Sequence, residues 1–303
     1  MNTGKIGENI LKRSVMTQLH SKRREIVRGV AAGEDCAEIL SGDGIITVSS
    51  INVCIIDEDT KEQIVLKRTF NDIAVSGAEP SAVLLSLIIP QEMQEAGLRR
   101  MIAYADDMCM ESGAQIADCD ISVSGAVESP VMTVSCIGRK TAETPGKAVP
   151  GDDIVVSKWA ALSGTVLLVH SHKEKLLKRF SNSFIDTAES FTRLFGVAPE
   201  AAVAAKSGAG CMHDASEGGI FNALWEIAEK SGVGLEIDLR SVPLRQETVE
   251  IGNYLDISPY ELMSDGMMAA AVKNGESMVR ELKAQDIDAA VIGKVISGND
   301  RCV

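Results

Sequence analysis

Aromatic residues, long apolar runs and an excess of basic charge are all missing from this 303-residue chain. Only 4% of the residues are aromatic while 45% are hydrophobic, so the interior must be built mainly from aliphatic side chains. The longest apolar run, residues 82–90, is too short to cross a bilayer, and we expect no membrane partner. The formal net charge of −13 argues against nucleic-acid binding, which needs a basic surface.

The seven cysteines form no Cys-x-x-Cys pair. An odd number of scattered cysteines predicts reduced thiols rather than disulfides or a zinc site. The first thirty residues are charged and lack an apolar segment, so no signal peptide is evident. We therefore expect a cytoplasmic protein.

Three common nucleotide and hydrolase motifs are also missing. The chain has no Gly-x-x-x-x-Gly-Lys-Ser/Thr loop, no Gly-x-Gly-x-x-Gly after a strand and no Gly-x-Ser-x-Gly. Their absence removes support for a P-loop kinase, a Rossmann dehydrogenase and an α/β-hydrolase. An acidic chain can still bind ATP when Mg²⁺ bridges its carboxylates and the phosphates.

The chain is long enough for two domains. Residues 1–32 are basic, and their apolar residues through Ile26 recur at near-helical spacing. This pattern predicts one amphipathic helix with a basic face. The basic face either covers an acidic site or is solvated. We expect one domain at 33–141, a linker rich in proline and glycine at 142–151, and a second domain at 151–303.

Strand and helix patterns do not alternate as repeated βαβ units, so the pattern favours an α+β fold. In the first domain, the expected strands are 45–56, 83–89, 114–124 and 131–137, and the expected helices are about 62–77 and 93–112. In the second domain, we expect a strand at 153–157, helices between 163 and 207, and strands near 233–238, 267–272 and 289–296.

The most informative segment contains Asn71 and Asp72 inside a predicted helix that stops at residues 77–80. The following strand is apolar enough to be buried on both faces. A buried carboxylate without donors or a cation would cost several kcal/mol, on the order of 2–7 for an unpaired polar group. Asp72 therefore either has polar partners or lies on a partly exposed helix face.

Further oxygen-bearing side chains lie at strand ends, turns and within strands of the first domain: Asp35, Asn52 and Asp120. Carboxylates from separate elements are what a Mg²⁺–phosphate site requires, because Mg²⁺ binds few protein ligands and takes the rest from water and phosphate. Taken one by one, such residues also commonly serve as turn residues.

In the second domain, residues 212–220 read Met-His-Asp-Ala-Ser-Glu-Gly-Gly-Ile and lead into a predicted helix. Asp214 or Ser216 could cap this helix, with Glu217 in its first turn. Gly218 and Gly219 suggest that a phosphate or another backbone approaches closely. His213 is either an acid or base, or a structural residue.

Taken in order, three motifs resemble the aminoimidazole-ribonucleotide-synthetase (PurM-like) superfamily, and within it AIR-synthase-related proteins and hydrogenase-maturation factors of the HypE type. The motifs are Gly-Glu-Asp-Cys-Ala at 33–37, Phe-Asn-Asp-Ile-Ala at 70–74 and the His-Asp to Gly-Gly segment at 213–219. The resemblance extends from Lys5 to about residue 295.

This resemblance implies an N-terminal α+β sheet domain, a C-terminal α/β sandwich, and a homodimer in which two N-terminal sheets form a shared barrel. It implies ATP with Mg²⁺ and phosphoryl transfer to an amide-like or carbonyl oxygen, with a small-molecule or protein-borne carboxamide as the substrate. The resemblance also implies three sets of site residues. The implied metal ligands are Asp35, Asn52, Asp72 and Asp120, and the implied catalytic residues are Asp72 and His213. The implied cofactor-binding residues are Lys5, Asn71, Asp214, Glu217, Gly218 and Gly219.

Several positions depart from the family pattern. Asn52 stands where relatives carry an aspartate, side chains at Asp118 and Cys119 replace two glycines, and Ala161 stands where glycine is common. These changes should weaken Mg–ATP binding. Cys302 is not preceded by the Pro-Arg-Ile sequence that precedes the cysteine of the maturation factors. Cys302 is therefore either a carrier of the group that is dehydrated or an ordinary cysteine in a strand.

Two functions therefore stay open. One is an ATP- and Mg²⁺-dependent enzyme, and the other is a catalytically degenerate nucleotide-binding homodimer with a regulatory or metalloenzyme-maturation role. The sequence does not identify the acceptor substrate.

Overall fold

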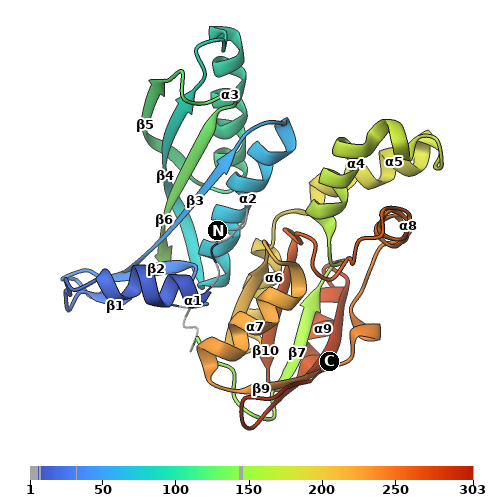
Figure 1. The fold of residues 1–303 in the computed structure, drawn as a ribbon. Coiled ribbons are helices and arrows are strands. Elements are labelled where there is room, and N and C mark those ends of the chain that lie inside the picture. The colour runs from blue at the N-terminus through green and yellow to red at the C-terminus, as the bar shows by residue number, and fades with distance from the viewer. Residues whose placement is uncertain (1–5, 7, 32, 143–145, 303) are drawn as a thin grey trace. The chain divides into compact units, whose positions relative to one another are not determined.

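A computed structural model describes residues 6, 8–31, 33–142 and 146–302 of the chain. The chain divides into two compact units. The first unit consists of residues 23–29 and 35–141, and the second consists of residues 1–22, 30–34 and 142–303. Figure 1 shows their elements. Lys5, implied above as a cofactor-binding residue, lies outside the described residues.

The first unit is a six-stranded sheet with two long helices packed on it. The strands are β1 (Ile26–Arg28), β2 (Cys36–Leu40), β3 (Ile46–Ile55), β4 (Ala78–Ile89), β5 (Gln115–Val123) and β6 (Val131–Lys140), and the helices are α2 (Asp59–Val75) and α3 (Glu95–Glu111). The order is β1-β2-β3-β6-β4-β5, with β4 and β5 parallel and the other neighbours antiparallel. The sheet is therefore mixed, as in an α+β fold.

Only one face of this sheet is covered within the unit. Along β4, buried Val83, Leu85 and Leu87 alternate with Leu84 and Ile88, which are 38% and 40% exposed. The buried set packs with α2 and α3 in one aliphatic core. The expectation that this strand is buried on both faces is therefore wrong for the single chain, because no element of the unit covers the other face.

The second unit also contains a six-stranded sheet, in the order β12-β9-β11-β7-β10-β8. Its strands are β7 (Asp153–Ser157), β8 (Cys211–Ala215), β9 (Gly234–Ile237), β10 (Met267–Val272), β11 (Ala289–Ile296) and β12 (Arg301–Cys302). Its longer helices are α4 (Leu162–Leu176), α5 (Asn182–Glu189), α6 (Ala198–Lys206), α7 (Gly219–Ser231), α8 (Gln246–Leu255) and α9 (Gly275–Lys283), with short 3-10 helices η3 (Ser190–Leu194) and η4 (Leu239–Ser241).

Strand β10 is buried on both faces, since all six of its residues are buried. Met267, Ala269 and Ala271 belong to the core that includes Ile220 and Ile227 of α7. The intervening residues point to the other face, where α6 and α9 contact the strand. Helices thus cover the two faces of this sheet.

The N-terminal segment differs from the expected single helix. A helical turn α1 (Glu8–Ile10) continues as a π-helical stretch η1 (Leu11–Val15) and a 3-10 turn η2 (Met16–Gln18), where helical geometry ends. Ile26 lies instead in β1, which pairs with β2. The β-branched pair at 26–27 favours a strand, and the neighbouring strand β2 supplies hydrogen bonds that the sequence pattern alone could not reveal.

No helix in the described part of the chain has the length and apolar character needed to cross a bilayer.

Candidate functional site

A buried polar cluster joins α2 to β3 in the first unit. Asp72 is 4% exposed, and its Oδ2 accepts hydrogen bonds from Ser50 Oγ at 2.5 Å and from Asn52 Nδ2 at 2.7 Å. Asn52 Nδ2 also lies 3.2 Å from Thr69 Oγ1, and Thr69 is completely buried. The carboxylate of Asp72 therefore has the polar partners that its burial requires.

The local sequence explains this arrangement. Ser50 and Asn52 are two residues apart on β3 and so point to the same face, the face that α2 covers. On α2, Thr69 and Asp72 are three residues apart and lie on one side of the helix. Asn71 is also buried, at 2% exposure. Sequence reasoning identified Asn52 and Asp72 but missed Ser50 and Thr69, whose spacing from those two residues was the available signal.

Asp35 directly precedes β2 and is half-buried. Its neighbour Cys36 pairs with Ser50 in the sheet. Asp35 therefore lies at the end of β2 that is next to the Asp72 cluster, and a site shared by the two carboxylates stays a prediction.

Asp120 does not join this cluster in the single chain. Strand register pairs Asp120 with Ser86, Ser86 with Thr133, and Thr133 with Val53. Directly paired residues point to the same face of a sheet, so Asp120 points to the face of Val53. Val53 follows Asn52 in β3 and therefore points to the opposite face from Asn52 and Asp72. Asp120 is exposed on the open face, opposite Asp72, so the expected grouping of these two carboxylates is wrong within one chain. Asp118 points to the same open face and cannot replace the missing charge at Asn52.

The remaining donor set suits a hard cation. Asp35 and Asp72 offer carboxylate oxygens, while Asn52 and Ser50 offer an amide and a hydroxyl oxygen. These are ligands that Mg²⁺ accepts, and it completes its octahedron with water or phosphate oxygens. Oxygen donors without sulfur or imidazole nitrogen do not match a zinc site.

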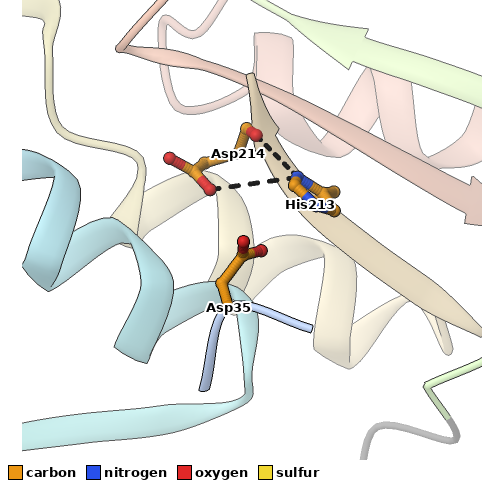
Figure 2. Close-up of side chains that lie close together, drawn as sticks. All are labelled: Asp35, His213 and Asp214. Atoms are coloured by element: carbon orange, nitrogen blue, oxygen red, sulfur yellow. Dashed lines mark hydrogen bonds and ion pairs between the residues drawn. The ribbon is translucent and has the colours of Figure 1, made fainter. Parts of the chain in front are cut away.

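In the second unit, the His213 and Asp214 side chains lie on edge strand β8 (Figure 2). Both are buried, at 3% and 1% exposure. His213 Nδ1 lies 2.7 Å from the main-chain oxygen of Asp214 and 3.9 Å from its carboxylate. Asp35, also drawn in Figure 2, belongs to the first unit and is described there.

The other ring nitrogen of His213 faces a residue that the sequence pattern did not identify. Nε2 lies 2.9 Å from Glu226 Oε2 on α7. A carbonyl oxygen only accepts, so Nδ1 carries the proton in its contact with Asp214. A ring whose two nitrogens both face acceptors has no free nitrogen for a substrate proton. This contact pattern favours a structural role for His213 over a general base.

Helix α7 begins later than expected, and neither Asp214 nor Ser216 caps it. Asp214 lies within β8, Glu217 lies in the turn before the helix, and the N-cap is Gly218 at φ +80°. These corrections arise because pairing of β8 with β10 extends the strand through Ala215. A Cβ at Gly219 would lie 2.5 Å from the main-chain oxygens of Tyr260 and Leu262. The close approach predicted here is thus made by another backbone segment.

Two further positions have clear environments. Ala161 precedes α4 with φ +61°, a left-handed conformation that glycine adopts without strain, which explains why glycine would suit this position. Cys302 is exposed in β12, beside Glu236 of β9.

Comparison with known families gives two matches that together span most of the chain. Residues 24–140 match "AIR synthase related protein, N-terminal domain", and residues 149–302 match "AIR synthase related protein, C-terminal domain".

Two similar proteins cover most of the chain. A "Putative hydrogenase expression/formation protein" of Methanocaldococcus jannaschii is 26% identical over 90% of this chain and 82% of its own length. A "Carbamoyl dehydratase HypE" of Rhodobacter capsulatus is 27% identical over 76% of this chain and 68% of its own length.

Solved structures show the same fold. Escherichia coli HypE, a hydrogenase maturation protein, has a TM-score of 0.72 at 20% identity, covering 84% of this chain and 81% of that one. A HypE structure in complex with ATP has a TM-score of 0.65 at 18% identity, covering 97% of this chain and 88% of that one. The expected two-domain, PurM-like α+β fold is confirmed.

Proposed function

Because the chain belongs to the AIR synthase related protein family, we propose that it is an ATP- and Mg²⁺-dependent enzyme that phosphorylates a carboxamide or carbonyl oxygen. The observation that carries the proposal is the buried Asp72 carboxylate held by Ser50 and Asn52. The HypE structure with ATP and the carbamoyl dehydratase relative support the nucleotide and the carboxamide class.

In this proposal Asp35 and Asp72 hold Mg²⁺, with oxygen atoms of Asn52 and Ser50 nearby. The metal would neutralise charge on the phosphates when bound. The Ser50 and Asn52 donors fix the orientation of Asp72, so the carboxylate is already in place before a ligand arrives. Asn71, Asp214, Glu217 and the turn at Gly218 remain proposed nucleotide-binding residues, and Lys5 a proposed phosphate ligand. His213 is assigned to structural support.

We propose that the protein works as a homodimer through the open face of the first sheet. Ile51, Val53 and Ile55 on β3 are 70%, 64% and 57% exposed. They continue the row of Leu84 and Ile88 on the same face, because β6 pairs with both strands. Exposed apolar residues gathered on one sheet face, here with Ser135 and Thr133 of β6 between them, are typical of a protein–protein interface. Seven free cysteines support a reducing compartment, as in the cytoplasm.

The second candidate function is a nucleotide-binding homodimer without turnover, with a regulatory or metalloenzyme-maturation role. Asn52 favours it, because an amide replaces an anionic ligand where the family pattern has aspartate. Ala161 at φ +61° also favours this second function, because a side chain stands at a left-handed position that glycine adopts without strain.

Calorimetric titration of ATP, with and without Mg²⁺, separates these functions when the products are analysed in the same samples. Metal-dependent binding with ADP formation supports the enzyme, and binding without turnover in the presence of carboxamide compounds supports the second candidate. Asp72→Asn should abolish the metal-dependent part of binding, whereas the exposed control Asp107→Asn on α3 should leave it unchanged. No binding at millimolar ATP would overturn both functions.

A further inference from the structure

A pocket lies in the first unit between the start of α2 and the facing side of α3. Its volume is about 440 Å³, and Glu62, Tyr104 and Met101 are among its lining residues. Glu62 precedes Asp72 by ten residues on the same helix, about 15 Å at 1.5 Å per residue. The pocket is therefore separate from the Asp72 cluster, and phosphoryl transfer as proposed above does not use it.

Glu62 lines this pocket with a buried carboxyl group. The residue is 5% exposed, and its Oε1 has no hydrogen-bond partner among the residues that the structure describes. Burial, and secondarily the charge of Asp59, raises the pKa of Glu62 to about 8. A buried acceptor without a donor is costly, and most native structures supply the donor from protein, water or a ligand.

The other lining groups determine which donor fits. Asp59 lies one turn before Glu62 on α2, so two carboxyl groups share one side of the pocket. Burial raises the pKa of Tyr104 to about 12, which keeps its phenol protonated. Met93 and Met101 supply apolar wall. The combination of two acids, an aromatic ring and methionines suits a positively charged group on an apolar body.

Arg100 is the one basic residue among those lining the pocket. It is exposed and forms no ion pair within the described part of the chain. An exposed guanidinium does not neutralise the buried Glu62, because exposed charges are strongly screened by water. Arg100 therefore supplies no donor to the buried Oε1 of Glu62.

We propose that this pocket binds a small organic cation, a primary ammonium on a short apolar chain, whose N–H groups donate to Glu62 Oε1. The ammonium supplies the missing donors, and its charge is opposite to that of Asp59 and to that of Glu62 once Glu62 is ionised. The apolar chain lies against Met93 and Met101, and the Tyr104 ring borders the charged end.

The test uses the full chain with n-butylammonium as the probe and n-butanol as the neutral probe of equal shape. Binding is followed by calorimetry and by NMR shifts of the Met93 and Met101 methyl groups. We expect saturable binding of butylammonium and at least tenfold weaker binding of butanol. Equal binding of the two probes, or displacement of butylammonium by millimolar Mg²⁺, would overturn the proposal.

Variants locate the site. Glu62→Gln keeps the shape of the side chain and should weaken butylammonium binding at least tenfold, and the exposed Asp59→Asn should weaken it several-fold. Glu92→Gln, an exposed residue before α3, is the matched control and should leave the affinity unchanged. Glu62→Gln and Asp59→Asn are two independent variants, so one of them still tests the proposal if the other folds poorly. A folded variant of either kind that binds butylammonium as tightly as the unmodified protein would contradict the proposal.

The pH dependence gives a second readout. Asp59 on α2 and Arg100 and Tyr104 on α3 are the other titratable groups that line the pocket, and butylammonium stays charged to about pH 10. Affinity should rise between pH 6 and pH 9 as Glu62 ionises, and this rise should be absent in Glu62→Gln. Affinity that falls over this range in the unmodified protein would oppose the proposal.

Discussion

Asn52 Nδ2 donates a 2.7 Å hydrogen bond to Asp72 Oδ2, linking β3 to α2 at a buried position. The same oxygen of Asp72 accepts from Ser50. A neutral amide therefore supports the carboxylate at a position where a second carboxylate would repel it. These two hydrogen bonds give the buried Asp72 carboxylate polar partners on β3, and they make Asn52 the decisive position for metal binding.

Asn52→Asp should make the protein depend on a divalent cation. Without metal, the new carboxylate faces Asp72 at hydrogen-bond distance, and repulsion at low dielectric should lower the melting temperature. With Mg²⁺, the added anionic ligand should raise metal affinity and restore stability. Thermal unfolding with EDTA and with Mg²⁺, compared with unmodified protein, measures both effects. An Asn52→Asp variant whose melting temperature is the same with EDTA and with Mg²⁺ would contradict a metal site at this cluster.

Val53→Asp should convert the proposed homodimer into a monomer. Val53 is 64% exposed in the single chain, so the substitution should not disturb the unit's own core, but it places a charge in the apolar face. Light scattering coupled to size-exclusion chromatography measures the mass. Val149→Asp, at a position 53% exposed in the second unit, is the matched control and should keep the dimer. A Val53→Asp dimer would place the interface elsewhere.

Glu226→Ala should destabilise the protein by about 1–3 kcal/mol, because it removes the carboxylate that lies 2.9 Å from the buried Nε2 of His213. Denaturant unfolding measures the loss. The control is Glu229→Ala on the same helix, which removes surface ion pairs with Lys12 and Arg301 and should cost less than about 1 kcal/mol. Equal effects of the two substitutions would show that the His213 contact is energetically unimportant.

Glu62 should make stability fall as pH rises. Its pKa is raised from 4.5 to about 8 in the folded protein, so the folded state binds more protons than the unfolded state between these values. The free energy of unfolding should therefore decrease from about pH 5 to pH 8, with a slope approaching about 1.4 kcal/mol per pH unit for one proton. Below the unfolded-state pKa, this contribution is fully present.

Denaturant unfolding at several pH values, on unmodified protein and on Glu62→Gln, isolates this contribution. The glutamine variant cannot ionise, so its stability should change less over the same range, and the difference between the two proteins should grow toward high pH. Parallel pH profiles of the two proteins would contradict a raised pKa at Glu62.

The sequence by itself determined the kinds of element and most of their places. The spacing of apolar residues correctly predicted β3, β5, β6 and β7 and both long helices of the first unit, because the apolar run or period of a strand or helix is visible in the local sequence. The placement of an asparagine and an aspartate in a predicted helix left two alternatives for Asp72, polar partners or a partly exposed helix face, and the motif order indicated the family.

Only the tertiary structure decided which residues meet. Strand register put Asp120 on the face opposite Asp72, β10 extended β8 through Asp214, and α7 brought Glu226 to His213. Hydrogen bonds between segments far apart in sequence set these relationships, and a register change of one residue reverses the face of every side chain in a strand. Local periodicity identifies a strand and its two faces, but the partner strand determines what each face meets.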